Sequence, residues 1–399
     1  MADSSTLVRI LRRLTFSHRR LDEFSGAEPA EVVARLLAEA PLDPEPPELG
    51  TDDDYSVLPR WWLEVMGRPD AGLHERMVWF WHGTFTSALS KAEPALMFRQ
   101  HRLIRRLALG NFRDLAQELT IDGAMLDWLD GNWSTSESPN ENFAREMMEL
   151  FCLGIGQYTE ADVKAGAYLF SGWHLDDDNG RAVVFDRSVG PQRSVEFLGG
   201  TASSATEAVD LICDHPACAP HVAGLVFSSF VGRAPSDDER ARHAAAFRDS
   251  GLELGELVAS VLNDPAFLAG PELRPRSAVE WFLATADLLD APLEHWILDQ
   301  LGQMPFDPPN VAGWPGSQRW TTAGSALARS IFGLDNAWDA PTLGSDPVAD
   351  VLDRAAVEDP TGTLADELRR AVVTGLTHGA TRPRSCTALV IASPEFAPG

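Results

Sequence analysis

The stretch that best indicates the fold is "SPNENFAREMMELFCLGIGQYTEADV", Ser138 to Val163, because it carries the start and stop signals of a helix. Ser138 or Asn140 can cap the first turn with a side-chain oxygen, and the proline between them suits that turn. Gly154 and Gly156 then end the helix, since glycine readily adopts the left-handed backbone that closes a helix. The stretch therefore predicts a short helix with well-defined ends.

At about 100° per residue, the polar side chains of this helix fall within an arc of roughly 100°. They are Asn142, Arg145, Glu146 and Glu149, and the opposite side carries Phe143, Met147, Leu150 and Phe151. Two hypotheses explain the polar stripe. Either it faces water, or it faces a cleft, because aromatic segments flank it at 77–85 ("MVWFWHGTF") and 167–175 ("AYLFSGWHL"). Buried acids would then need Arg145 or a metal ion as a partner.

Most other long segments repeat apolar residues at helical spacing, as in "PAEVVARLLAEA" (29–40). The exception is 181–200, where two short β-branched runs flank a Gly-Pro turn and predict a β-hairpin. The proline-rich acidic passages 40–54 and 339–350 are typical of surface loops. We therefore expect a mainly α protein, a single helical domain over 1–399 with one small β-hairpin insertion at 181–200.

The charge and apolar patterning exclude some classes of partner. A formal net charge of −26 argues against binding to nucleic acid or an anionic membrane surface, because both need clustered cations. The local charge is positive at 9–20 and at 99–110. The arginines there either attract an anionic group or pair with the excess acids of the chain. No stretch approaches the ~20 apolar residues of a membrane span, and no apolar secretory core is present near the N-terminus. Four scattered cysteines favour a reducing compartment, so we expect a cytoplasmic protein.

The aromatic segment 77–85 is apolar on every side except at His82, so we expect its helix to be buried all round, with His82 inside. A buried histidine is either a hydrogen-bonded core residue or, near carboxylates, a general base. Glu146 and Glu149 lie three residues apart and could hold a metal ion with His82, as carboxylates do in helical bundles. No second histidine in helical register supports such a metal site.

Several aromatic and glycine-rich motifs follow one another in a characteristic order. They are "RMVWFWHGTFT" (76–86), "LALGNFRDL" (107–115), "AMLDWLDGN" (124–132), "PNENFAREMMELFCLGIGQYTEADV" (139–163), "FSGWHLD" (170–176), "DHPACAPHVAGLVFSSFVG" (214–232) and "PFDPPNVAGWPGSQRWTT" (305–322). In these motifs the chain resembles a large, uncharacterised bacterial family catalogued only as a domain of unknown function, the eighteen-hundredth of its numbered series. The resemblance spans nearly the whole chain.

The resemblance implies no particular reaction. Many members of the family look exported and are encoded beside a sulfatase-like protein, so the resemblance implies such a protein as a partner. Members usually carry a second histidine, in the pattern F-W-H-N-H-F. This chain has Thr84 at the position of that histidine, and Gly83 replaces the asparagine before it. They also tend to carry a His-Asp pair in the hairpin region, where this chain reads "FDRSVGPQ" around Ser188 and Val189. A metal or acid/base centre built on those groups would be largely lost here.

Other patterns are also open to two interpretations. The segment 213–221, "CDHPACAPH", offers Cys213, His215, Cys218 and His221. These are either zinc ligands in a non-standard spacing or a helix start with a buried thiol. In "PPNVAGWPGSQRWTT" (308–322), Gly313 and Gly316 allow close approach of the backbone, and Trp314 and Trp320 either line a pocket or anchor the loop on the core. His174, ahead of three aspartates, indicates a solvated turn, since the ligand pattern of a calcium loop is missing.

Two hypotheses about function follow. The first is an enzyme that acts on an anionic or polar substrate in a cleft between the aromatic and the acid-rich helices. Its catalytic candidates are His82 as base or metal ligand, Arg145 as the clamp on an anion, Glu146 and Glu149 as acid/base or metal-binding groups, and Asp130; its substrate-binding candidates are Asn142, Trp81, Trp173 and Trp314. The cofactor is unknown, with a divalent metal as the candidate.

The second hypothesis is a non-catalytic helical scaffold, or a maturation partner of the sulfatase-like protein, in which the polar stripe serves structure. It predicts a large apolar patch on the surface, because a stable protein partner needs apolar area to bury.

Overall fold

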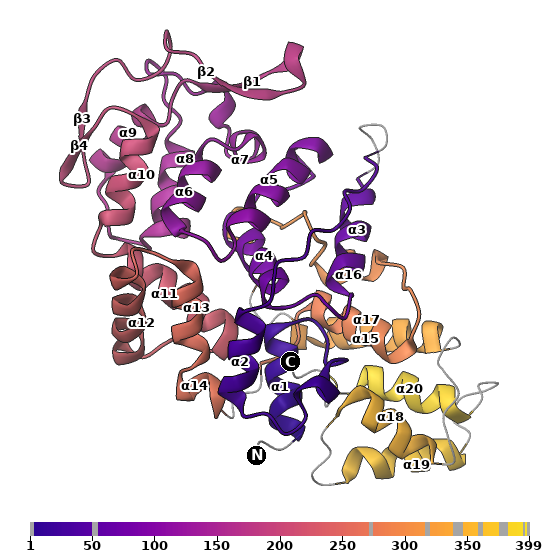
Figure 1. The fold of residues 1–399 in the computed structure, drawn as a ribbon. Helices are drawn as coiled ribbons and strands as arrows, with labels where there is room; N and C mark the ends of the chain where they lie inside the picture. The colour runs from indigo at the N-terminus through magenta and orange to yellow at the C-terminus, as the bar shows by residue number, and fades with distance from the viewer. Residues whose placement is uncertain are drawn as a thin grey trace.

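Helices make up most of the computed structural model, which describes residues 4–49, 55–270, 274–315, 320–337, 346–357, 362–374, 382–393 and 396. Helices α1 to α20 are joined by loops, and the strands among the described residues form two small hairpins (Figure 1). The prediction of a mainly α fold is confirmed. Within these residues, none of the helices is both long and apolar enough to cross a bilayer. The predicted loop at 339–350 and Gly316 lie largely outside the described residues.

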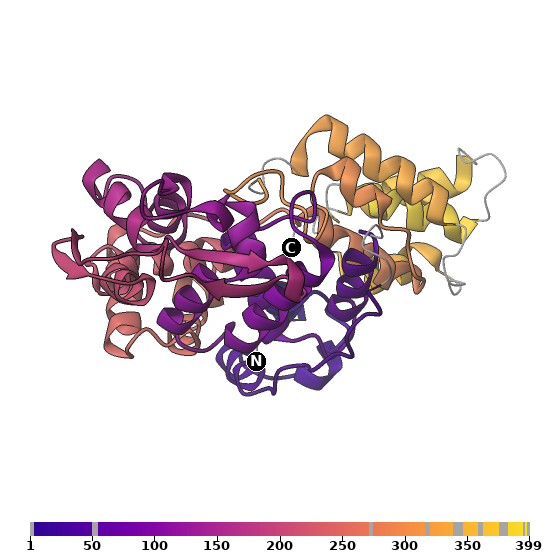
Figure 2. The same cartoon turned by 90° about the horizontal axis from the view of Figure 1, so that it is seen from above.

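The first five helices lie in the middle of the molecule, between two other groups of helices (Figures 1 and 2). They are α1 (Ser4–Leu14), α2 (Pro29–Leu37), α3 (Val57–Met66), α4 (Leu73–Thr84) and α5 (Pro94–Leu107), with a 3-10 turn at Leu21–Phe24. Helix α1 shows why they pack. Leu7, Ile10, Leu11 and Leu14 recur at helical spacing and all four are buried, so a single apolar stripe holds α1 against its neighbours.

A second group, on the left of Figure 1, follows α5 in the chain. It contains α6 (Phe112–Thr120), α7 (Gly123–Trp128), a 3-10 turn at Gly131–Trp133, α8 (Glu141–Glu146), α9 (Glu160–Leu169), α10 (Ala205–Asp214), α11 (Cys218–Val231), α12 (Asp237–Asp249), α13 (Leu254–Leu262) and α14 (Pro265–Leu268). A π-helical turn at Met147–Cys152 directly continues α8. Helix α11 is buried along most of its length and packs against α12 and α13.

A third group, coloured orange to yellow in Figure 1, lies on the opposite side of the central helices. It contains α15 (Ala278–Leu289), α16 (Trp296–Leu301), α17 (Ala323–Asn336), α18 (Pro347–Ala355), α19 (Thr363–Thr374) and α20 (Arg382–Ala392). Side chains tie it to the rest of the chain. Arg12 on α1 donates to the carbonyls of Ala355 and Ala356 at the end of α18, and Arg276 donates to the carbonyl of Phe396.

The strands form two hairpins where the sequence predicted one. Strand β1 (Trp173–Asp176) pairs antiparallel with β2 (Ala182–Phe185), and β3 (Val195–Phe197) pairs antiparallel with β4 (Gly200–Ala202). The prediction paired the runs that became β2 and β3 across the Gly-Pro turn. That loop would be longer than the two to five residues of a typical hairpin. Instead, β2 pairs with β1 and β3 pairs with β4, each through a shorter turn.

The segment between α16 and α17 lies along the end of α4. The backbone N–H of Leu89 donates to the carbonyl of Phe306 at 2.9 Å, and the Thr86 hydroxyl donates to the carbonyl of Val311 at 2.7 Å. Gly313 has a φ of +84°, and a Cβ atom placed on it would lie 2.4 Å from the carbonyl oxygen of Gly83. The close approach of this loop to α4 therefore requires glycine at position 313.

We expect Gly313→Ala to lower the stability of the protein by about 3 kcal/mol, because it combines left-handed strain with a backbone clash. Gly156→Ala is the matched control: Gly156 has a φ of +79°, but a Cβ atom there meets nothing within 4 Å. It should cost only the strain, about 1 kcal/mol. Urea denaturation of both variants measures the difference. Equal losses would contradict the tight docking of the loop on α4.

Candidate functional site

The polar stripe of α8 lies at the surface. Asn140, one of the two predicted caps, caps the helix, and its side-chain oxygen accepts from the backbone N–H of Asn142 at 2.8 Å. Arg145 forms a two-bonded ion pair with the exposed Glu160, at 2.8 and 2.9 Å. The apolar side of the helix packs inward, where the ring of Phe143 meets that of Phe170. Arg145 therefore pairs with a surface acid instead of reaching into an aromatic cleft.

The π-helical turn changes the direction of the residues after Glu146. Its backbone bonds run from residue i to i−5, as in the bond from the Leu153 N–H to the Met148 carbonyl, so each residue turns by less than 100°. Glu149 accepts a hydrogen bond from the Tyr158 hydroxyl, a neighbour on the same surface. Burial and the nearby Glu149 raise the pKa of Glu146. The assumption of uniform helical spacing was therefore wrong at this point of the chain.

His82 lies in the core, away from those acids. It is 1% exposed, and its ring packs against Trp62 and Phe306. Its Nε2 lies 3.1 Å from Nδ1 of His101, a residue of α5 that is also buried. On the far side, the Arg105 guanidinium donates to Nε2 of His101. His82 thus belongs to a chain of buried polar groups between α4 and α5.

The donors in this chain fix the tautomers. The Arg105 guanidinium can only donate, so Nε2 of His101 accepts and its Nδ1 carries the proton, which it donates to Nε2 of His82. Burial lowers the pKa of His82 to about 3 and also lowers the pKa of His101, so both rings are neutral near pH 7. With Nε2 of His82 already accepting inside the core, these contacts are those of a structural histidine.

Glu75 completes the chain and balances its charge. Glu75 is 1% exposed, and its Oε1 accepts from Nη2 of Arg105 and from the indole N–H of Trp62, both at 2.7 Å. Two residues of α4, Glu75 and His82, therefore point toward α5, where they meet Arg105 and His101. The guanidinium of Arg105 balances the charge of this buried carboxylate, which is the usual condition for keeping charges inside a protein, although Oε2 of Glu75 has no hydrogen-bond partner among the described residues.

The other predicted site residues occupy separate places. Asp130 is exposed and pairs with Lys91, and Asn142 is exposed. The indole of the fully buried Trp81 donates to the carbonyl of Ala108, and Trp173 packs against Phe185 within the first hairpin. Among the described residues, no three His, Cys, Asp or Glu side chains are grouped so that they could hold a metal ion. The predicted set of His82, Glu146 and Glu149 is therefore not assembled.

The cysteine- and histidine-containing segment forms a helix start, one of its two predicted interpretations. Cys218 is the first residue of α11 and is buried, as are Cys213 and Cys152. Nε2 of His221 lies 2.9 Å from the carbonyl oxygen of Leu150, and His215 accepts from a neighbouring backbone N–H. The histidines thus contact the backbone, and the thiols lie in the core.

A cleft opens beside a neighbouring face of α4, roughly 100° around the helix from Glu75 and His82. Arg76, Trp79, Phe80 and Gly83 recur at i, i+3, i+4 and i+7, so they share one face of the helix, and this face borders a cleft of about 470 Å³. Helix α11, the start of α15, the loop before α17 and Arg13 of α1 form the other walls. Trp79 and Phe80 are only half-buried, so the expectation that this helix is buried all round was wrong on this side.

Tryptophan rings form the apolar wall of the cleft. The rings of Trp79 and Trp314 are stacked, with centroids 4.6 Å apart and planes 15° from parallel. Gly313 lets this loop lie against α4, and so places Trp314 on Trp79. Trp320 and Pro315 line the same cleft. Trp314, which the sequence offered as either a pocket residue or an anchor, thus has both positions, because it lines the cleft and packs on α4.

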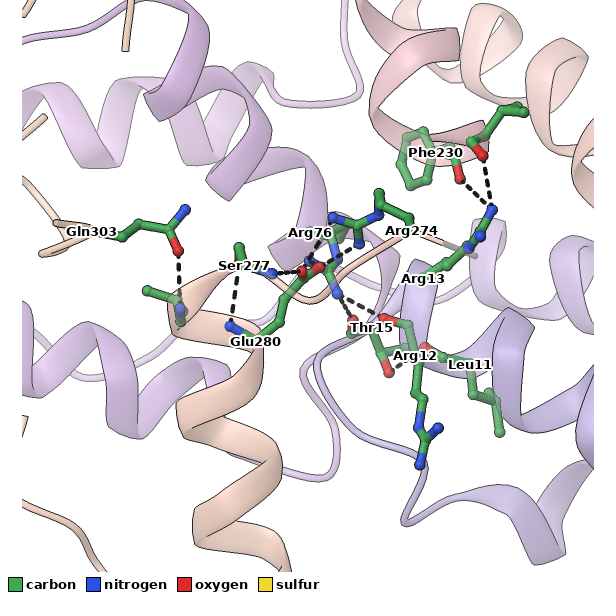
Figure 3. A network of polar contacts seen from close by, with 12 residues as sticks. Leu11, Arg12, Arg13, Thr15, Arg76, Phe230, Arg274, Ser277, Glu280 and Gln303 are labelled. Carbon is green, nitrogen blue, oxygen red and sulfur yellow. Dashed lines mark hydrogen bonds and ion pairs between the residues drawn. The ribbon is translucent and has the colours of Figure 1, made fainter. Parts of the chain in front are cut away.

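Charged groups form the polar wall, shown in Figure 3. Glu280 accepts from Nη1 of Arg76 at 2.6 Å and from both terminal nitrogens of Arg274, at 2.5 and 3.1 Å. Its second oxygen also accepts the backbone N–H of Ser277, which completes the capping box of α15. Gln303 accepts the N–H of Val279 beside it. We call Arg76, Arg274 and Glu280 the cleft triad.

Glu280 and Arg76 are both ionised at neutral pH. Burial by itself would raise the pKa of Glu280, but Arg274 and Arg76 outweigh it, and the net pKa lies well below the ordinary value of a glutamate. Burial lowers the pKa of Arg76 to about 10, so this guanidinium also stays charged. Two cations therefore share one carboxylate, and one positive charge of the triad is not balanced within it.

Several N–H groups of this cleft lack an acceptor. Nε of Arg76, Nε of Arg274 and Nε1 of Trp314 are buried atoms without a hydrogen-bond partner among the described residues. All three are donors, and burying a donor without an acceptor costs about 1–3 kcal/mol. The residues that line the cleft therefore carry buried donors that no described residue satisfies.

Two local signals in the sequence could have pointed to this cleft. One is the shared helical face of Arg76, Trp79, Phe80 and Gly83. The other is the capping-box pattern Ser-x-x-Glu at Ser277, which places a glutamate at the start of a helix. Neither signal shows that the two segments meet, because they are about 200 residues apart in the chain.

Comparison with known proteins identifies the family. Residues 9–398 match the family described as "Protein of unknown function (DUF1800)", so the chain belongs to that family. No curated protein and no solved structure matches the chain.

We expect Arg105→Met to lower the free energy of unfolding by about 3–5 kcal/mol, because it leaves the buried carboxylate of Glu75 without its cation. Arg106→Met is the matched control, since the neighbouring Arg106 forms an exposed ion pair with Glu118. It should cost less than about 1 kcal/mol. Urea denaturation at pH 7 compares the two. A small loss at position 105 would show that the chain from Glu75 to His82 does not support the core.

Proposed function

We propose that this member of the DUF1800 family binds a small anionic ligand in the cleft between α4, α11 and α15. The observation that carries the proposal is the set of buried N–H donors without acceptors on Arg76, Arg274 and Trp314. A ligand rich in oxygen acceptors would satisfy these donors. Carboxylate, phosphate and sulfate groups are such ligands, and guanidinium groups bind them with strong, charge-assisted hydrogen bonds.

The charge of the triad supports an anion over a neutral ligand. Arg76 and Arg274 outnumber Glu280, although the whole chain carries a formal charge of −26. An unbalanced cation on a largely buried side chain attracts an anion more strongly than one on an exposed side chain, because water screens it less. The local excess of positive charge runs against the composition of the chain, which is typical of a site with a specific use.

The apolar wall supports a ligand with a flat apolar part. Trp79, Trp314 and Phe80 present ring surfaces beside the charged wall. Ligand sites commonly combine such apolar walls with a few placed polar groups. A compact aryl or other planar group that carries one acidic function matches both walls and the volume of about 470 Å³.

Binding is better supported than acid–base catalysis at this cleft. Its described lining offers guanidinium groups, hydroxyls such as those of Thr84 and Ser228, and an amide, while the carboxylate of Glu280 is engaged on both oxygens. The enzyme hypothesis, with catalytic roles for His82, Arg145, Glu146, Glu149 and Asp130, stays a prediction from the sequence.

Isothermal titration calorimetry with benzoate and phenyl sulfate tests the proposal, with benzamide as the neutral control. We expect the two anions to bind and benzamide to bind at least about tenfold more weakly. Arg274→Gln should weaken the binding of both anions at least about tenfold, because it removes a charge-assisted donor. Arg145→Gln, on the surface of α8, should leave binding unchanged.

Two results would contradict this proposal. Equal affinity for benzamide and benzoate would show that charge plays no part. Loss of binding in Arg145→Gln but not in Arg274→Gln would move the site to the stripe on α8, as the sequence first suggested. Circular dichroism confirms that each variant is folded before its affinity is compared.

A second proposal concerns a protein partner. Leu327, Ile331 and Leu334 share one face of α17 and are 62%, 48% and 51% exposed, and the exposed Trp296 belongs to the neighbouring α16. An exposed apolar stripe of this kind is typical of a binding surface. It supports the scaffold hypothesis, in which the family resemblance suggests the co-encoded sulfatase-like protein as the partner.

Co-expression of the two proteins followed by size-exclusion chromatography tests this second proposal. We expect a complex that the double change Leu327→Ser with Leu334→Ser weakens at least about tenfold, since central apolar contacts carry most of the binding energy. Ile155→Ser is the control, because Ile155 is 79% exposed in a different part of the surface. Separate elution of the two wild-type proteins would refute the partnership.

A further inference from the structure

We infer that Glu280 acts as a built-in competitor of the ligand and restricts the cleft to anions that carry a single negative charge. The inference rests on the proposed anion-binding function and adds the charge class of the ligand. It follows from how the carboxylate of Glu280 occupies the two arginines that an incoming anion would use.

Glu280 already engages the strongest donors of the cleft. Its Oε1 accepts from Nη1 of Arg76 and Nη2 of Arg274, and its Oε2 accepts from Nη1 of Arg274 and from the backbone of Ser277. Both terminal nitrogens of Arg274 are therefore directed at this carboxylate (Figure 3). What remains for a ligand at the triad is the two Nε–H groups and the one unbalanced positive charge.

The second arginine goes beyond what a helix cap requires. Helix α12 has the same capping box, in which Glu239 binds the backbone of Ser236 and pairs with the nearby Arg233. In α15, Arg274 corresponds to Arg233, and Arg76 is added from α4, 204 residues away in the chain. The additional cation thus comes from the wall of the cleft, where it is shared between Glu280 and the space that the ligand would occupy.

Displacing Glu280 altogether would be costly. Glu280 is 5% exposed, and a buried carboxylate that loses its cations is strongly destabilising. The ligand must therefore share the arginines with Glu280 and bind beside its negative charge. A first negative charge on the ligand balances the excess cation of the triad. A second one meets the repulsion of Glu280, and the triad has no further cation to balance it. Arg13 also lines the cleft, but its Nη1 donates to the carbonyls of Phe230 and Val231.

Phenyl sulfate and phenyl phosphate form a suitable pair of probes. Both are tetrahedral oxyanions on the same ring, but phenyl sulfate carries one charge at any working pH, whereas phenyl phosphate is mostly a dianion at pH 8 because its second pKa is about 6. At pH 8 we expect the wild-type protein to bind phenyl sulfate more tightly than phenyl phosphate. At pH 5, where phenyl phosphate is a monoanion, the two affinities should converge.

Glu280→Gln tests the role of the residue directly. The amide keeps the size of the side chain and removes the charge, so we expect phenyl phosphate at pH 8 to bind at least about tenfold more tightly than to the wild type, and the preference for phenyl sulfate to disappear. Glu239→Gln is the matched control, since it makes the same change in the capping box of α12, outside the cleft. It should leave both affinities unchanged.

The outcomes separate this inference from the proposed function. If the wild type binds phenyl sulfate and Arg274→Gln does not, but Glu280→Gln leaves the preference unchanged, the competitor role is overturned and the anion site stands. If neither the wild type nor Glu280→Gln binds any aryl anion, both are overturned. Should Glu280→Gln fail to fold, the pH comparison on the wild type decides: tighter binding of phenyl phosphate than of phenyl sulfate at pH 8 refutes the inference.

Discussion

The ion pair between Arg76 and Glu280 is the interaction on which the arrangement of this molecule depends. Both side chains are buried, and they join α4 to α15 across 204 residues of chain. Arg76 also donates to the backbone carbonyls of Arg12 and Thr15 at the end of α1. Because buried charges need all of their partners, three distant segments must meet at one point. The candidate cleft lies where they meet, so its shape follows from satisfying this pair.

Helix α4 separates two polar environments with different consequences. Toward α5, Glu75 and His82 take part in a chain in which Arg105 and His101 supply the matching groups. On the neighbouring face, Arg76 and Trp79 border open space and belong to a wall with donors to spare. The first arrangement is buried in the core, where Oε2 of Glu75 is left without a hydrogen-bond partner among the described residues. The second borders open space and has unsatisfied donors, so the cleft offers a ligand more than the surroundings of His82 do.

Local signals in the sequence predicted local features well. The cap at Asn140 and the buried thiol at the start of α11 follow from short patterns, and the structure has both. The π-helical turn at Met147–Cys152 and the two-hairpin pairing could not be predicted in this way, because competing turns of similar cost differ only in their tertiary contacts. The cleft needs Arg76 and Glu280 together, and no periodicity in either segment indicates that they are neighbours in space.

The bond from Arg12 to the end of α18 has a consequence for how the protein is made. This arginine reaches the carbonyl of Ala355, 343 residues later in the chain, and the backbone of Arg12 is one of the supports of Arg76. A chain emerging from the ribosome folds its early segments first. Here α1 lacks this anchor until residue 355 has been translated. The charged wall of the cleft therefore cannot form until Glu280 has been translated, because Arg76 has to wait for this partner.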